Sequence, residues 1–563
     1  MSAAHEHRPR RVLLGQHLLA AGLLRADELA LALLEQARIA RPLGEVLVAM
    51  GFLPEHALVR GLGEVLAVET ADLAHETPSS EALALLPGPV ARRHRALPLR
   101  VETDPPRLWL AMADPRDVLA LDHVAASLRQ SFTLKPMLSG AAQLEAAIAR
   151  HYADGDAVAR ALGTAPDGAA VTALAGGESL VGLVDAMLAD AVQRGASDLH
   201  LEPEAGFLRM RLRVDGVLGT LHCLPAALQP GISVRLKVLA GLDIAESRLP
   251  QDGHFTQRIH GREIDVRLST MPTRHGENLV LRVLDRRMGC VPLVDLGLEP
   301  AQHQQLSAVL QRPDGLVLVC GPTGAGKTTT LYSLLHALSS DAVNVMTLED
   351  PIEYALPRIR QSAVNTGARL GFADGVRALL RQDPDVLLVG EIRDEATAAM
   401  ALRGAMTGHL VLSTLHAGSA LGALPRLLDL GLRPALLAGS LSALIAQRLL
   451  RRLKEVGAPW HAASDSERQW LGVPAAEGCR VRRPAASASD AVHVDYAGRF
   501  AVLEILRWSA ALDQQLMADP TPAALLAQAR GEGFETLREV AVRQVLAGRT
   551  SVAEARRVLG GPL

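Results

Sequence analysis

The second half of the chain alternates short, mostly apolar runs with stretches whose apolar residues recur at helical spacing. Leu316–Cys320, Val386–Val389 and Leu410–Thr414 are predicted to be buried strands, because each run is brief and ends at glycine or polar residues. Residues 328–338 carry leucines three and four positions apart, which predicts a helix directly after the first of these strands. The alternation predicts an α/β fold with an open sheet.

The first half of the chain shows weaker patterns that predict smaller domains. Residues 80–152 combine an apolar run, Leu108–Met112, with a helical pattern over Ala141–Tyr152, and predict a small α/β domain. Residues 153–178 are rich in Ala, Gly and Asp and are interpreted as a flexible linker. A helix over 181–194 and strands over 207–214, 263–269 and 278–284, with a turn at 250–253, then predict an α+β domain.

The N-terminal segment contains a tandem repeat of 29 residues. Residues 14–29 and 43–58 share a Leu-Gly pair followed by leucines and a second glycine at matching positions. In each copy a short amphipathic helix is predicted to end at Gly22 or Gly51, since glycine suits a helix C-terminus, and a second helix follows Asp27 or Pro54. The pattern is typical of a small helical bundle.

Length, charge and cysteine content narrow the class of protein. At 563 residues the chain is expected to contain several domains. Its net charge of −3 argues against nucleic acid as the main partner, and its four separated cysteines favour reduced thiols. No apolar stretch is long enough to span a membrane. Basic residues before residue 12 resemble the head of a signal peptide, but the following segment repeats later, so we expect a cytoplasmic protein.

A phosphate-binding loop follows the first predicted strand. Residues 321–328 match the pattern G-x-x-x-x-G-K-[ST], in which glycines turn backbone N–H groups toward phosphates. Lys327 is expected to reach the β- and γ-phosphates of ATP, and the Thr328 hydroxyl to bind Mg²⁺. The predicted nucleotide-binding residues are Gly321, Pro322, Thr323, Gly324, Ala325, Gly326, Lys327, Thr328 and Thr329.

Acidic residues follow two further predicted strands. Glu349 and Asp350 come after the apolar-leaning run Val343–Leu348, and Glu391 follows Val386–Val389. Because the carboxyl ends of strands in an open α/β sheet bind ligands, these carboxylates are candidates for holding Mg²⁺ and positioning water. We predict catalytic roles for Glu349 and Glu391 and metal contacts from Thr328, Asp350 and Glu391.

Two histidines, His409 and His416, bracket the third predicted strand. A histidine beside a strand is usually structural, so the pair leaves open whether one of them senses the phosphate. Of the two, His416 is the predicted catalytic residue.

Four segments together resemble a known family. Thr347–Tyr354 resembles its Asp box, Leu380–Asp394 its Walker B segment and Thr407–His416 its His box, and the loop at 321–328 completes the set. The family is the secretion ATPase E family of type II secretion and type IV pilus assembly, and the resemblance covers roughly residues 80–152 and 179–563. It implies a RecA-like P-loop ATPase core, a homo-hexamer, and docking from the cytoplasm on the inner membrane. It also implies an inner-membrane platform and cytoplasmic adaptor proteins as partners.

The resemblance further implies arginines around the nucleotide. Arg267 and Arg282 lie on predicted strands of the preceding domain, and Arg377 and Arg381 are one helical turn apart before the Walker B strand. A guanidinium that meets the developing charge of the γ-phosphate is worth about 10³–10⁵ in rate. These four are the predicted catalytic arginines, with surface ion pairs as the alternative for each.

Two departures from the family pattern matter. The repeat resembles the cyclic di-GMP module of some members, whose motif begins Arg-Leu-Gly, but Leu13 and Pro42 stand where the arginine belongs, which puts that ligand in doubt. Many members also hold zinc through two C-x-x-C pairs, whereas this chain has only Cys479 in the corresponding stretch. Because a tetrahedral site needs four ligands, we predict no zinc and expect 455–495 to be loosely structured.

The predicted organisation has five parts. They are a helical repeat domain at 1–78, a small α/β domain at 79–152, a linker at 153–178, an α+β domain at 179–290 and a RecA-like core with a C-terminal helical region at 291–563. The predicted function is a Mg²⁺-dependent ATPase that drives pseudopilus assembly and protein export by type II secretion. Alternatives are pilus assembly, a nucleotide-gated scaffold that hardly hydrolyses ATP, and a nucleic-acid translocase.

Overall fold

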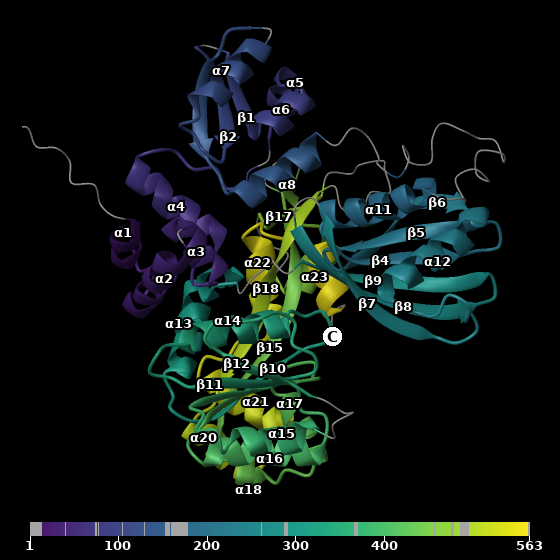
Figure 1. Ribbon diagram of the computed structural model, residues 1–563. Helices are drawn as coiled ribbons and strands as arrows, with labels where there is room; N and C mark the ends of the chain where they lie inside the picture. The colour runs from purple at the N-terminus through teal and green to yellow at the C-terminus, as the bar shows by residue number, and fades with distance from the viewer. Residues whose placement is uncertain are drawn as a thin grey trace, which may run out of the picture. The chain divides into compact units, whose positions relative to one another are not determined.

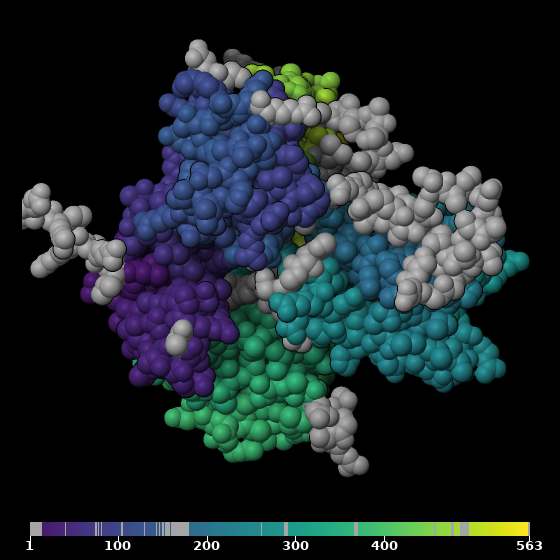
Figure 2. Space-filling model, turned by 45° about the horizontal axis from the view of Figure 1, so that its top comes forward, coloured from purple at the N-terminus to yellow at the C-terminus, as the bar shows by residue number. Residues whose placement is uncertain are grey.

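The computed structural model describes residues 14–560, apart from 40, 74–75, 77, 104, 129, 153–157, 159–177, 260–261, 286–290, 365–369, 455–457, 474–477 and 485–494. The chain divides into two compact units, Met1–Gly289 and Cys290–Leu563. In Figure 2 the first unit runs from purple to teal and the second from green to yellow. The linker predicted at 153–178 lies outside the described residues except for Val158 and Glu178.

The tandem repeat folds as two helical hairpins, seen at the purple end of Figure 1. The helices are α1 (Leu14–Ala20), α2 (Ala26–Ile39), α3 (Leu43–Ala49) and α4 (Glu55–Leu66). Gly22 and Gly51 follow α1 and α3 with φ of 67° and 72°, a left-handed conformation that glycine adopts without strain. The glycines thus end the first helix of each copy.

The Leu-Gly pair of the repeat has a packing role. A Cβ added to Gly15 would stand 2.7 Å from Leu29 Cδ1, and one added to Gly44 would stand 3.0 Å from Leu58 Cδ1. Each glycine therefore lets a leucine of the next helix approach the backbone closely. The Leu-Gly pair therefore recurs in the sequence because the same glycine–leucine contact recurs in both hairpins.

A three-stranded sheet follows, with order β1 (Ala96–Thr103), β2 (Pro106–Met112) and β3 (Thr133–Leu138). Strands β1 and β2 are antiparallel, whereas β2 and β3 are parallel and are joined through a helix, α7 (Val118–Ser127). The remaining helices are α5 (Ser80–Leu85), α6 (Gly88–His94) and α8 (Ala141–His151). Buried Leu97, Leu110 and Leu144 belong to the core of this domain.

The α+β domain is a six-stranded antiparallel sheet of order β6-β5-β4-β9-β8-β7. Its strands are β4 (Ala196–Pro203), β5 (Phe207–Val214), β6 (Val217–Pro225), β7 (Gln251–Ile259), β8 (Arg262–Thr273) and β9 (Gly276–Asp285). Helices α11 (Glu178–Gln193) and α12 (Gln229–Ala240) pack on the sheet through Leu183, Val184, Ile232 and Leu236. The turn predicted at 250–253 is wrong, because Gly253 already pairs with Leu268 inside β7 and β8.

The second unit is built on a seven-stranded sheet of order β12-β11-β13-β14-β10-β15-β18 (Figure 1). All neighbours are parallel except β15 and β18, which are antiparallel. The strands are β10 (Gly315–Cys320), β11 (Val345–Glu349), β12 (Arg360–Ala363), β13 (Val386–Val389), β14 (Leu410–Leu415), β15 (Leu441–Leu453) and β18 (Tyr496–Arg507). This confirms the predicted open α/β sheet.

Helices cover both faces of this sheet, as Figure 1 shows. On one face α13 (Pro300–Leu310) and α14 (Lys327–Leu338) pack through leucines such as Leu306 and Leu335. The other face is covered by α15 (Phe372–Leu379), α16 (Glu395–Met406), α17 (Ala423–Asp429), α20 (Ala510–Ala518), α21 (Pro522–Gly531) and α22 (Leu537–Leu546). Because β10, β13 and β14 are buried on both faces, their sequences are nearly continuous apolar runs.

The expectation that 455–495 is loosely structured is wrong for the described part of the segment. β16 (Trp460–Ala462) and β17 (Arg480–Arg482) form an antiparallel pair, and α19 (Asp465–Leu471) lies between them in the sequence. The Trp470 ring is buried with Val545 and Val552, which belong to α22 and α23 (Val552–Leu559). Trp470 also donates a 3.1 Å hydrogen bond to the carbonyl of Gly560. The apolar packing of the ring and this hydrogen bond together hold the segment on the C-terminal helices.

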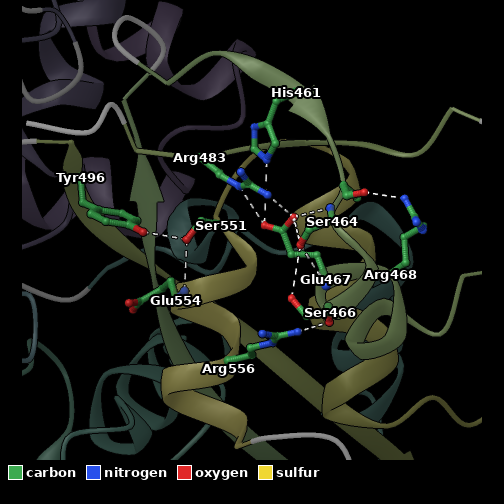
Figure 3. A network of polar contacts seen from close by, with 11 residues as sticks. His461, Ser464, Ser466, Glu467, Arg468, Arg483, Tyr496, Ser551, Glu554 and Arg556 are labelled. Carbon is green, nitrogen blue, oxygen red and sulfur yellow. Dashed lines mark hydrogen bonds and ion pairs between the residues drawn. The ribbon is translucent and has the colours of Figure 1, made fainter.

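A buried carboxylate organises the same segment (Figure 3). Glu467 accepts hydrogen bonds from Arg483 Nε at 3.0 Å, from the Ser464 N–H at 2.8 Å and from the Ser464 hydroxyl at 2.9 Å. His461 Nε2 lies 3.9 Å from the same carboxylate. Burial alone would raise the pKa of Glu467, but these hydrogen bonds and the Arg483 charge outweigh it and lower the pKa to about 2.

We expect Glu467→Gln to lower the free energy of unfolding by about 2 kcal/mol, because it leaves Arg483 without its charged partner. That corresponds to a fall in Tm of about 4–8 °C in thermal unfolding followed by circular dichroism. The folded-state pKa is depressed below 4.5, so the contribution is complete above that pH and is lost as the pH falls toward 2. The difference in Tm should therefore be equal at pH 8 and pH 6.

The matched control is Asp465→Asn in the same helix. Asp465 pairs with Arg468, but its side chain is 95% exposed, so its loss should change the free energy of unfolding by less than about 0.5 kcal/mol. Equal Tm values for Glu467→Gln and Asp465→Asn would contradict a structural role for the buried carboxylate.

Candidate functional site

The predicted phosphate-binding loop connects β10 to α14. Gly324 and Gly326 have φ of 78° and 83°, and α14 begins at Lys327 immediately afterwards. Lys327, Thr328 and Thr329 therefore occupy the first turn of α14, where backbone N–H groups lack partners within the helix. Those N–H groups and the helix dipole suit an anion at this position.

Strand β15 supports the loop from behind. A Cβ on Gly321 would stand 2.8 Å from the Gln447 carbonyl oxygen, and one on Gly326 would stand 2.9 Å from Gln447 Nε2. The Gln447 side chain is buried and accepts a 2.7 Å hydrogen bond from the Thr330 hydroxyl in α14. Both glycines are therefore required by close packing, and the loop is held between its own helix and β15.

The Lys327 side chain folds back over the loop. Its ammonium donates hydrogen bonds to the carbonyls of Gly321 at 2.9 Å and Pro322 at 3.1 Å. Burial is the largest cause that lowers the pKa of Lys327, and the nearby Arg448 charge lowers it further. A phosphate beside Lys327 would favour the charged form.

The predicted acidic residues meet at the carboxyl edge of the sheet. The Gly390 N–H donates to the Leu348 carbonyl at 2.8 Å, which sets Glu349 and Asp350 beside the segment that carries Glu391. The Thr414 hydroxyl donates to the Gly390 carbonyl at 2.8 Å, which joins β14 to the same edge. Parallel pairing of β11, β13, β14 and β10 thus gathers residues that are up to 95 positions apart in the sequence, from Gly321 to His416.

Glu349 is buried, with 4% of its surface exposed, and its carboxylate is fully engaged. It accepts hydrogen bonds from the Tyr332 hydroxyl, from the Thr347 hydroxyl at 2.6 Å and from Gln361 Nε2 at 3.1 Å. Burial, together with the hydrogen bond to Glu349, raises the pKa of Tyr332 above its ordinary value. The carboxylate is held in one orientation by three neutral donors.

Glu391 is more accessible than Glu349. Its carboxylate pairs with Arg393, and His416 Nε2 lies 3.9 Å from its second oxygen. Pairing with Glu391 raises the pKa of Arg393. The arrangement brings Glu391 and His416, two of the predicted site residues, close together.

The two histidines occupy different ends of β14. His416 follows the strand at its carboxyl end, and its side chain is 57% exposed there. His409 precedes the strand, and its Nδ1 lies 3.0 Å from the Gly404 carbonyl and 3.1 Å from the Thr407 hydroxyl. His409 has a structural role at the opposite edge of the sheet.

The four predicted arginines fall into two groups. Arg267 and Arg282 pair across β8 and β9 and line a cavity of about 490 Å³ in the first unit. Arg282 Nε lies 3.5 Å from Asp198 in the same cavity. In the second unit Arg377 pairs with Asp374 at 2.8 Å, and Arg381 donates a 3.0 Å hydrogen bond to the Arg377 carbonyl.

The donor set at the sheet edge suits Mg²⁺. Thr328, Asp350 and Glu391 offer a hydroxyl and two carboxylates, and hard cations prefer oxygen ligands. In the described part of the chain, no three His, Cys, Asp or Glu side chains gather closely enough to hold a metal by themselves. Mg²⁺ is usually bound through one or two carboxylates together with phosphates and water.

Four residues that bond to the predicted site or to the segments around it were not predicted from the sequence. They are Tyr332 on α14, Gln447 and Arg448 on β15, and Glu504 on β18. One signal was available, because Gln447-Arg448 interrupts an apolar run from Leu441 to Leu450. The partners of Gln447 and Arg448 could not be inferred, since Gln447 lies 120 residues beyond Lys327 in the sequence.

Known proteins are similar to this chain over most of its length. A family model described as Type II/IV secretion system protein matches residues 173–557. The chain is 44% identical over 385 residues to type II secretion system protein E of Klebsiella pneumoniae, covering 68% of this chain and 76% of that protein. It is 38% identical over 464 residues to the Xanthomonas campestris protein of the same name, covering 80% and 81%. It is 34% identical over 558 residues to the type IV pilus assembly ATPase PilB of Myxococcus xanthus, covering 96% and 98%.

Two further matches concern the fold and the N-terminal region. The structure of the ATPase DotB from Legionella pneumophila aligns with a TM-score of 0.50 and 21% identity, covering 66% of this chain and 94% of that chain, which supports the shared fold. A model of the MshEN domain matches residues 66–158. The doubt about cyclic di-GMP, which rested on the missing arginine, is not confirmed by this match.

We expect Tyr332→Phe to lower the kcat for ATP hydrolysis about tenfold and to leave KM within about twofold. The hydroxyl holds one oxygen of Glu349, and losing a hydrogen bond to a charged group costs roughly a factor of ten. Steady-state hydrolysis measures both constants.

Tyr152→Phe is the control, because Tyr152 is a half-buried tyrosine in the first unit whose hydroxyl lies 3.4 Å from the Leu83 carbonyl. It should leave both constants unchanged. A Tyr332→Phe variant with the parent's kcat would contradict a role in hydrolysis for the hydrogen bond between Tyr332 and Glu349.

Proposed function

Because the chain belongs to the Type II/IV secretion system protein family, we propose that it is an ATPase that drives pseudopilus assembly and protein export by a type II secretion system. The resemblance to secretion ATPases seen in the sequence is confirmed. The relatives named type II secretion system protein E are 38–44% identical and align over two thirds or more of this chain, which supports this destination for the motor.

A single observation carries the hydrolysis chemistry. The loop at 321–328, Glu349 and Asp350, Glu391, and His416 come from four parallel strands and meet at one edge of the sheet. Phosphoryl transfer needs phosphate binding, charge neutralisation and a positioned water, and this edge offers groups for each.

We assign the following roles. Lys327 and the loop N–H groups bind the β- and γ-phosphates of ATP, while Thr328, Asp350 and Glu391 hold Mg²⁺, which neutralises phosphate charge when bound. Glu349, oriented by its three donors, positions the attacking water. His416, beside Glu391, senses the γ-phosphate and transmits its loss to the loop that follows β14.

Arginines supply the remaining positive charge. Arg267 and Arg282 line one cavity together with Asp198 and Asp252, and their guanidinium groups are the candidates in the first unit for binding phosphate oxygens. Arg377 and Arg381 are the candidates in the second unit. Because such arginines act across neighbouring segments of an assembly, we infer that turnover depends on the hexamer expected for this family.

The proposed partners follow from the family. They are five further copies of this chain in a hexamer, a cytoplasmic adaptor and the inner-membrane platform that the motor drives. Among the described residues no helix has the length and hydropathy needed to cross a bilayer. From the family resemblance we propose attachment to the inner membrane from the cytoplasmic side through these protein partners.

Pilus assembly is the second candidate function. The match to PilB of Myxococcus xanthus covers 96% of this chain, including the N-terminal repeat, which favours this alternative specifically. The chemistry of the sheet edge would be the same in both machines. The two functions differ only in the structure that the motor extends.

We expect Lys327→Ala to reduce ATP hydrolysis below detection, because the γ-phosphate loses its main side-chain partner. Release of phosphate from the purified, assembled protein measures this. Lys454→Ala is the matched control, since Lys454 is an exposed lysine that follows β15, outside the phosphate-binding loop, and it should keep the parent's rate. Unchanged kcat in Lys327→Ala would contradict the assignment of the site.

The same pair of variants separates the two machines in the host cell. With Lys327→Ala in place of the parent gene, loss of specific proteins from the medium with intact pili supports type II secretion. Loss of pili with normal export assigns the chain to pilus assembly instead. The Lys454→Ala strain should match the parent in both measurements.

A further inference from the structure

Strand β15 continues past the end of β10 and places two polar side chains on opposite faces of the sheet. Cys320, the last residue of β10, pairs with Ala446, so Gln447 and Arg448 extend alongside the phosphate-binding loop. The Gln447 side chain bonds Thr330 in α14 on one face. Successive side chains of a strand point to opposite faces, so Arg448 projects to the other.

Among the residues that the structure describes, only backbone oxygens accept hydrogen bonds from Arg448. Its two terminal nitrogens donate 2.8 Å hydrogen bonds to the carbonyls of Gln447 and Gly418. Among the described residues no carboxylate lies within ion-pair distance of it. By contrast, Arg451 in the same strand is buried and pairs with Glu554 at 2.8 Å.

Glu504, the carboxylate whose charge acts on Arg448, is bonded to other donors. Glu504 lies on β18 opposite Ala446, and its buried carboxylate accepts hydrogen bonds from the N–H groups of Ala420 at 2.7 Å and Leu537 at 2.8 Å. Burial raises the pKa of Glu504 and is the main cause that lowers the pKa of Arg448. A half-buried guanidinium without its own anion is costly unless an anion joins it.

The position of Arg448 indicates which anion. A Cβ on Gly321 would stand 3.3 Å from a terminal nitrogen of Arg448, so the guanidinium borders the first residue of the loop. Its charge also acts on Lys327, whose pKa it helps to lower. Lys327 and Arg448 thus place two positive charges beside one phosphate-binding loop, and a polyphosphate carries the negative charges that would pair with both.

We propose that Arg448 binds the phosphate chain of the nucleotide beside Lys327 and, through its bond to Gly418, couples phosphate occupancy to the loop that follows His416. Arg448 holds the Gly418 carbonyl and Glu504 holds the Ala420 N–H, so the middle of this short loop is bonded to both β15 and β18. A shift of the guanidinium toward phosphate releases or moves Gly418. The inference rests on the proposed nucleotide site and adds a residue from the same unit to it.

The test is nucleotide affinity of the full-length protein, measured by displacement of a fluorescent ATP analogue with ATP and with tripolyphosphate. Arg448→Gln should weaken both about tenfold to a hundredfold, because a hydrogen-bonded charge is lost from the phosphates. Arg448→Lys should recover most of the affinity, since it restores the charge. Arg452→Gln, which removes a charge from the same strand four residues further on, should bind both as the parent does.

Several outcomes would overturn the proposal. One is ATP affinity of Arg448→Gln within about threefold of the parent, and another is an Arg448→Lys variant as weak as Arg448→Gln. A third is a loss of affinity accompanied by an equal fall in Tm of the nucleotide-free protein, which would mark a purely structural residue. If the weakening affects ATP but not tripolyphosphate, Arg448 does not contact phosphate.

Lys327→Ala separates this failure from failure of the proposed function. If Lys327→Ala loses ATP affinity and Arg448→Gln does not, the nucleotide site stands and the role of Arg448 is rejected. If neither variant loses affinity, the loop at 321–328 is not the nucleotide site and both proposals fall.

Discussion

The close approach of β15 to the loop at 321–328 is the constraint on which the second unit depends. A phosphate-binding loop must turn its N–H groups inward, and here it does so while pressed against Gln447, which leaves no room for a Cβ at Gly321 or Gly326. The hydrogen bond between Gln447 and Thr330 then fixes the start of α14 against the sheet. Loop, helix and strand are therefore placed by one set of contacts.

Parallel pairing extends this constraint to the rest of the edge. Once β10 lies between β14 and β15, the turns after β11, β13 and β14 reach the same side, and short bonds such as Gly390 to Leu348 set their relative positions. Carboxylates gathered in this way would repel one another if left free. Glu349 instead accepts hydrogen bonds from neutral side chains, and Glu391 pairs with the charge of Arg393.

The buried carboxylates of the second unit share a second feature. Glu504 accepts two backbone N–H groups, Glu467 accepts one together with the Ser464 hydroxyl and Arg483, and Glu554 is held by Arg451 and Arg557. Each ties a loop or helix end to a neighbouring element. The segment around Glu467, which has one cysteine, is organised by such a carboxylate and by the Trp470 core.

The sequence by itself determined the local elements and the chemistry they carry. Continuous apolar runs predicted β10, β13 and β14, the glycine pattern predicted the loop, and acids after strands predicted the site, because each signal lies within a few residues. Tertiary structure alone decided what depends on distant partners. The turn predicted at 250–253 became the start of β7 through pairing with β8, the segment around Trp470 gained order from α22 and α23, and Arg448 met the loop only because β15 pairs with β10. Such contacts join residues from 15 positions apart, as for Gly253 and Leu268, to 126 positions apart, as for Cys320 and Ala446, and local patterns carry no record of them.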